Sequence, residues 1–236
     1  MHAEKQITDF VNSLKQAAGG NLECVALFGS AASGEFHADY SDINMLCVVR
    51  ELSAPVLAAL APTIVAWTRK QFPAPLIFSR AELEQSTDVF AIEMLDIRQR
   101  HRTLYGEDIF TGINVPMDRH RVQLEHELRT KLLTLRQSYL HAAGDDKRVR
   151  RLMLDSVSAF STLFRHTLIA MGEQPALHKA ENIQRLAART RFDPGIFLKL
   201  LQVRQRTAKE NEIEAASAFA QYLDGINTVV QAVDAL

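Results

Sequence analysis

Cysteine is nearly absent from this chain of 236 residues, which contains only Cys24 and Cys47. Each cysteine stands alone within an apolar stretch. This spacing matches neither a zinc-binding pattern nor the disulfide framework of a small secreted protein. The sequence therefore predicts two buried, reduced thiols and a cytoplasmic location.

The chain also lacks long apolar runs and an excess of charge of either sign. No apolar run approaches the roughly 20 residues that a membrane-spanning helix needs, and no apolar segment follows a basic start. The 27 basic residues nearly balance the 28 acidic ones, which leaves a formal net charge of −1. Balanced charge gives no strong signal for nucleic-acid binding. We therefore expect no membrane among the partners, and the sequence carries no strong nucleic-acid signal.

Glycine is scarce, with 10 residues, whereas 47% of the chain is apolar. Such a composition predicts a packed globular protein, and the length suffices for one large domain or two small ones. The most informative stretch comprises two apolar runs, 22–28 and 43–49, joined by a turn of small residues. The first run ends in Gly29-Ser30, and the second begins directly after Asp42. The pattern predicts two buried strands with polar side chains where they meet the turn.

These polar positions suit phosphate and metal chemistry. Glycine allows a backbone to approach a phosphate closely, and the N–H groups of a following helical turn can receive its charge. Ser30 adds a hydroxyl donor, and Asp42 offers hard oxygen ligands of the kind that Mg²⁺ prefers. A plainer interpretation, in which Gly29-Ser30 is only a turn and Asp42 only a cap, also fits the local pattern.

The stretch resembles the signature of the nucleotidyltransferase superfamily, in which a hydrophobic-Gly-Ser segment is followed by Asp-hydrophobic-Asp. This superfamily includes the aminoglycoside and the minimal nucleotidyltransferases. The resemblance implies that Gly29 and Ser30 hold a nucleoside triphosphate and that Asp42 and residue 44 serve as catalytic metal ligands in a two-ion magnesium site. In this chain the second aspartate of the signature is replaced by Asn44.

The resemblance also implies a third carboxylate on a neighbouring strand, but the expected strand 76–78 contains no acid. Asp39, Glu82 and Glu93 are the candidates for a displaced carboxylate. The amide oxygen of Asn44 can coordinate a metal, yet it lacks the charge of a carboxylate. By Coulomb's law this loss weakens a partly desolvated metal site by roughly several kcal/mol.

Three functions follow from the resemblance. The first is a nucleotidyltransferase-like protein, which is a pseudoenzyme if its activity is lost altogether. Its Mg-dependent transfer of a nucleoside monophosphate from an NTP to a hydroxyl of a small molecule or protein is weakened or lost. The second is an active aminoglycoside-type transferase that uses a displaced carboxylate, so the sequence leaves open whether the protein is an enzyme. The third is a helical-domain ribonuclease or a toxin–antitoxin-type partner module. Arg121 before His126 and Arg136 before His141 match the spacing of an Arg–His ribonuclease motif, but chance produces such matches about as often.

The remaining periodicity predicts an α/β nucleotidyltransferase-like domain at 1–116, followed by an all-α helical bundle domain at 117–236. In the first domain we expect helices at 3–18 and 53–70, strands at 22–28, 43–49 and 76–78, and an amphipathic helix at 88–102 that buries Phe90. After residue 117 the period is helical throughout, with short turns that suit an up-and-down bundle. The apolar stripe between Ile213 and Val233 predicts either bundle core or the seam of a homodimer.

Overall fold

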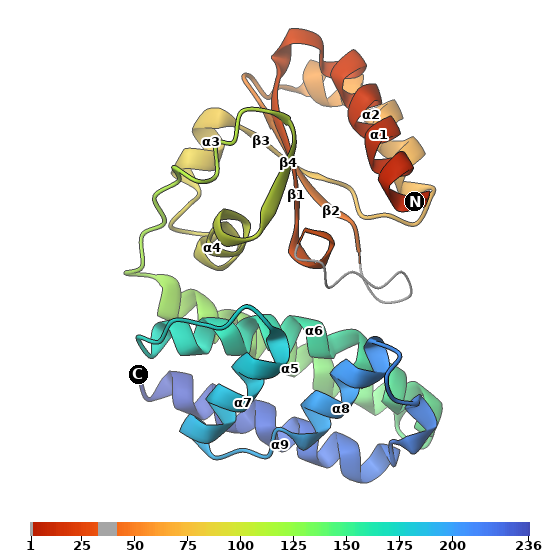
Figure 1. Cartoon of the computed structure of the whole chain (residues 1–236), viewed down its shortest axis with the longest axis vertical. Helices are drawn as coiled ribbons and strands as arrows, with labels where there is room; N and C mark the ends of the chain where they lie inside the picture. The colour runs from red at the N-terminus through yellow and green to blue at the C-terminus, as the bar shows by residue number, and fades with distance from the viewer. Residues whose placement is uncertain (1, 33–41) are drawn as a thin grey trace. The chain divides into compact units, whose positions relative to one another are not determined.

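The computed structural model describes residues 2–32 and 42–236, and the chain divides into two compact units, 1–117 and 118–236 (Figure 1). The first unit combines a sheet with helices, and the second is helical. The elements of the first unit are α1 (His2–Ala18), β1 (Leu22–Phe28), β2 (Asn44–Val49), α2 (Ala54–Thr68), β3 (Leu76–Ser79), α3 (Arg80–Gln85), α4 (Ala91–Gln99) and β4 (His101–Gly106).

The sheet of the first unit has the strand order β3-β2-β1-β4 within the described residues. β1 pairs antiparallel with both β2 and β4, whereas β2 and β3 run parallel. Figure 1 shows α1 and α2 on one face of this sheet and α3 and α4 on the other. Because both faces are covered, β1 and β2 are apolar along nearly their whole length, as the sequence predicts.

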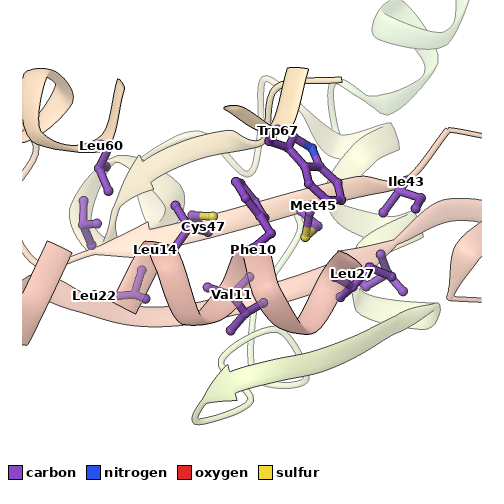
Figure 2. Close-up of a cluster of buried hydrophobic side chains, with 13 residues drawn as sticks. Phe10, Val11, Leu14, Leu22, Leu27, Ile43, Met45, Cys47, Leu60 and Trp67 are labelled. Carbon is purple, nitrogen blue, oxygen red and sulfur yellow. The ribbon is translucent and has the colours of Figure 1, made fainter. Parts of the chain in front are cut away.

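Each face of the sheet has its own core. The residues between α1, α2 and the sheet include Phe10, Leu14, Leu27, Met45 and Trp67, whose side chains converge in Figure 2. The Trp67 ring stacks between Phe10 and Phe72, with ring centroids 4.4 and 4.3 Å away, and its indole N–H donates to the carbonyl of Pro73. Buried indoles usually have such a partner, and this one fixes the end of α2 against the chain that leads to β3.

The opposite core contains alternate residues of the same strands together with α3, α4 and the segment after β4. Its members include Cys24, Ala26, Leu46, Val48, Leu83, Met94 and Phe110. Both cysteines are buried and unpaired, in agreement with the sequence prediction. Burial raises the pKa of Cys24 to about 11 and that of Cys47 to about 12, so both thiols are protonated at neutral pH.

One predicted element is wrong in its second half. The helix expected at 88–102 is α4, which spans only Ala91–Gln99, and the chain then enters strand β4 at His101. Phe90 precedes α4 and is 42% exposed, not buried as expected. β4 was missed because its residues are largely polar and it is stabilised by pairing with β1, which lies some 75 residues earlier in the chain.

The second unit comprises α5 (His120–Ala142), α6 (Asp146–Ala170), α7 (Lys179–Thr190), α8 (Gly195–Arg204) and α9 (Ala215–Asp234). α6 contacts each of the other helices of this unit. Asp145 caps α6 by accepting hydrogen bonds from the N–H groups of Lys147 and Arg148, as the sequence predicts. The apolar stripe of α9, including Phe219, Tyr222 and Ile226, is buried within the unit and forms part of its core.

Among residues 2–32 and 42–236, no helix combines the length and apolar character that a membrane span requires.

Gly106, at the end of β4, has a φ of +78°, and an added Cβ would lie 1.8 Å from the carbonyl oxygen of Glu23. We therefore expect Gly106→Ala to lower the free energy of unfolding by at least about 3 kcal/mol, because backbone on both strands must move. Gly20→Ala is the matched control, since a Cβ there meets nothing within 4 Å. Denaturant titration of both variants measures the effect, and equal stabilities would contradict it.

A buried pair of histidines joins α5 to α6. His120 Nε2 lies 2.9 Å from His166 Nδ1, and Arg165 Nη2 donates to His166 Nε2 at 3.3 Å. A guanidinium can only donate, so His166 must carry its proton on Nδ1 and donate it to His120. Burial, reinforced by His166, lowers the pKa of His120 from 6.5 to about 4.

A folded-state pKa below the unfolded value means that the unfolded chain binds more protons between these two values. The stabilisation from neutral His120 is therefore complete above pH 6.5 and is lost as the pH falls towards 4. Between pH 7 and pH 4.5 we expect wild type to lose about 2 kcal/mol more stability than His120→Asn. Denaturant titrations of both proteins at the two pH values test this, and equal losses would exclude His120 as the titrating group.

Candidate functional site

The turn after β1 begins at a position that requires glycine. Phe28 is still extended, with φ of −139° and ψ of 176°, whereas Gly29 has a φ of +72°. The chain then forms a short 3₁₀ turn, Gly29–Ala31, in which the N–H of Ala32 donates to the carbonyl of Gly29 at 3.1 Å. Positive φ is a conformation that residues with a Cβ rarely adopt. The glycine thus lets the chain turn away abruptly at the end of β1.

Asn44 lies directly beside this turn. It is the first residue of β2 and pairs in register with Phe28, the last residue of β1. The Asn44 amide nitrogen Nδ2 lies 3.3 Å from the point where a Cβ on Gly29 would stand. Strand pairing therefore brings together two of the residues that the sequence selects, Gly29 and Asn44.

The other two selected residues flank this contact along the chain. Ser30 follows Gly29 within the 3₁₀ turn. Asp42 is exposed, lies outside the strand and precedes Asn44 by two residues. The selected residues thus occur at the end of β1 and at or just before the start of β2.

The structure constrains the candidates for a third carboxylate. β3, which lies beside β2, contains no acid among Leu76–Ser79. Glu82 accepts a hydrogen bond from the backbone N–H of Ser79 at 2.8 Å, while Ser79 Oγ accepts one from the N–H of Glu82. The bond from the Ser79 backbone is the main reason that the pKa of Glu82 is lowered. This capping box commits Glu82 to the start of α3.

Glu93 and Asp39 are the two remaining candidates for a third carboxylate. Glu93 lies in the first turn of α4, a helix that covers the sheet face to which Leu46 and Val48 also belong. Asp39 lies outside the described residues.

The two-ion magnesium site stays a prediction. Within them, no group of three or more His, Cys, Asp or Glu side chains is placed to hold a metal ion. Asp42 and Asn44 contribute one carboxylate and one neutral amide. Mg²⁺ at nucleotide sites is usually held by one or two carboxylates together with substrate phosphates, so this pair supplies only part of such a ligand set.

The sequence did not point to a histidine that lies beside the same end of β1. His101 begins β4 and is in register with Phe28, on the opposite side of β1 from Asn44. Its Nδ1 lies 2.7 Å from the carbonyl of Ile97, and its Nε2 lies 2.9 Å from the carboxylate of Asp108. Both ring nitrogens are thus occupied by contacts within the protein. His101 therefore serves to fix the start of β4.

Asp108 is the acceptor at the centre of this local network. It accepts hydrogen bonds from the hydroxyl of Thr111 at 2.6 Å and from the N–H of Phe110 at 3.0 Å, besides the contact with His101. The Thr111 hydroxyl is the leading cause that lowers the pKa of Asp108. An aspartate that bonds to the backbone two residues ahead is a recognisable turn pattern, but nothing in the sequence shows that His101 is its partner.

Comparison with known proteins gives a result at the level of structure alone. No protein-family model matches the sequence, and no curated protein matches it. The structure is similar to the crystal structure of spectinomycin adenyltransferase AAD(9) from Enterococcus faecialis with ATP and spectinomycin, with a TM-score of 0.60. The likeness covers 98% of this chain and 99% of that chain at 16% sequence identity.

The chain has a nucleotidyltransferase-like fold. This finding confirms, at the level of the fold, the resemblance inferred from the Gly29-Ser30 stretch. The nucleotidyltransferase-like fold also accounts for the order of an α/β part followed by a helical part, because the match extends over nearly the whole chain.

Proposed function

We propose that this protein binds the triphosphate of a nucleotide at the Gly29-Ser30 turn and that its transfer of the nucleoside monophosphate is weakened or lost. The reaction in question moves a nucleoside monophosphate from an NTP to a hydroxyl group of a small molecule or a protein. The single observation that carries the proposal is the position of Asn44, whose amide lies against the Gly29 turn. The turn is kept, whereas the charge beside it is lost.

The interaction energy lost with the carboxylate charge at residue 44 is large compared with the energies that change catalytic rates. In a partly desolvated site, one full charge next to a dication is worth roughly several kcal/mol. Each 1.4 kcal/mol of transition-state stabilisation changes a rate by about tenfold. Asp42 and Asn44 are the candidate ligands of magnesium, which would neutralise the charge that develops on the phosphate oxygens. The missing acid on β3 and the commitment of Glu82 to a helix cap leave this ligand set incomplete among the described residues.

An active aminoglycoside-type transferase is the second candidate. It is favoured by the similarity along the whole chain to a spectinomycin adenyltransferase whose structure includes ATP and spectinomycin. This candidate needs a displaced carboxylate, for which Asp39 and Glu93 remain. The two candidates share the nucleotide and differ in whether transfer proceeds at an appreciable rate.

The ribonuclease or toxin–antitoxin-type alternative remains the weakest of the three. Arg121 donates to the carboxylate of Glu125 and to the carbonyl of Val233, and Arg136 donates to the side chain of Asn227. Both arginines therefore hold α5 against α9 in the second unit, which explains their presence without any catalytic role.

Restoring the missing charge tests the proposal. We expect Asn44→Asp to raise the rate of ATP-dependent pyrophosphate release at least about a hundredfold over wild type, because it supplies the absent carboxylate. Spectinomycin and water serve as trial acceptors, and mass spectrometry detects the adenylylated product. The double variant Asp42→Ala/Asn44→Asp is the control and should be inactive.

Two results would contradict the proposal. An Asn44→Asp protein no faster than wild type would remove Asn44 as the cause of weak catalysis. Rapid turnover by wild type that Asp42→Ala abolishes would show that the transferase is fully active.

A further inference from the structure

Helix α2 has an unusual composition for a surface helix. Its 15 residues, Ala54–Thr68, include no Asp, Glu, Lys or Arg. Only Leu60 and Trp67 among them are buried. A solvated helix normally carries charged residues on its outer face, so α2 presents an apolar surface that its own unit does not cover.

Six of the exposed residues of α2 form one continuous face. They recur at the spacing of successive helical turns, and the side chains of Leu57 and Val65 are each 46% exposed. We call this surface the α2 face, and its members are Ala54, Leu57, Ala58, Ala61, Pro62 and Val65. The opposite side of the helix packs on α1 and the sheet through Leu60 and Trp67. The α2 face is therefore free for a partner outside the first unit.

We propose that the α2 face is a homodimer interface, in which α2 packs antiparallel on α2 of a second copy about a two-fold axis near Ala61. A two-fold axis places the same residues opposite one another, so a face without charge meets its copy without repulsion. The small side chains of Ala58 and Ala61 at its centre allow the two helices to approach closely, while Leu57 and Val65 supply larger apolar contacts.

The charges at the two ends of α2 favour a second copy in this orientation. Glu51 precedes the helix, and Arg69 and Lys70 follow it. All three residues are exposed. Ala61 lies at the middle of the helix, so antiparallel pairing brings Glu51 of one copy to the end that carries Arg69 in the other. The opposed helix dipoles favour the same arrangement.

The chemistry of α2 argues against a lipid surface as the occupant. Helices that lie in a membrane interface carry Lys and Arg along a polar face, whereas α2 has no charged residue along its length.

The size of the face sets the expected affinity. A helix of 15 residues is about 22 Å long. A single pair of such helices buries less than the roughly 1,200 Å² typical of stable interfaces. We therefore expect a weak dimer, with a dissociation constant between about 10 µM and 1 mM.

Sedimentation equilibrium of the full chain, at concentrations up to about 1 mM, tests the inference. Ala61→Glu puts two like charges together at the two-fold axis and should raise the dissociation constant at least about a hundredfold. Ala59→Glu is the matched control, because Ala59 is exposed on the same helix but lies on nearly its opposite side from Ala61. This control should dimerise like wild type, and both variants should retain the wild-type circular dichroism.

A charge exchange tests the orientation. Glu51→Lys alone should weaken the dimer about threefold to tenfold, and the double variant Glu51→Lys/Arg69→Glu should restore it, because both end contacts are then re-formed with reversed signs. A wild-type monomer at all concentrations would overturn the proposal. A dimer that Ala61→Glu leaves intact, or that the double exchange fails to restore, would overturn it equally.

Discussion

The register between β1 and β2 fixes the candidate site. Because Phe28 pairs with Asn44, the chain that leaves β1 at Gly29 must pass directly beside the first side chain of β2. A shift of one residue would send Asn44 to the other face of the sheet. The register is in turn specified by burial on both faces, since from Cys24 to Phe28 alternate residues of β1 belong to the two opposite cores. The packing of α1–α4 therefore determines where the Gly29 turn lies.

Elements with a local apolar pattern could be predicted from the sequence, whereas elements that depend on a distant partner could not. β1 spans the predicted residues 22–28, and α1, α2 and β3 lie close to their predicted ranges, because each carries a local apolar pattern and a recognisable end signal. β4 and the contact between His101 and Asp108 were not predicted. Their stability comes from pairing with β1 and from a turn that the chain reaches only after leaving the strand. Local patterns do not encode such distant partners.

The candidate site was predictable to a similar degree. Gly29 and Asn44 were selected from sequence, and the structure places them together. The capping role of Glu82 was not foreseen, since it depends on two hydrogen bonds with Ser79 that only the structure reveals. The division of the chain at residue 116 stays a prediction about independent domains, although contacts within the chain separate near Met117.

A transferase site combines two separate properties, a turn that receives a phosphate and carboxylates that hold metal ions. Gly29 has the positive φ of a turn that the proposed function assigns to the phosphate, whereas Asn44 lacks the charge of a metal-binding carboxylate. Calorimetric titration of the wild-type protein with ATP, GTP, CTP and UTP, with magnesium and with a chelator, measures these properties separately. We predict nucleotide binding whose affinity changes less than about threefold with magnesium, because one carboxylate and one amide hold a dication weakly. Binding that appears only with magnesium would contradict the account and would place a competent metal site at Asp42.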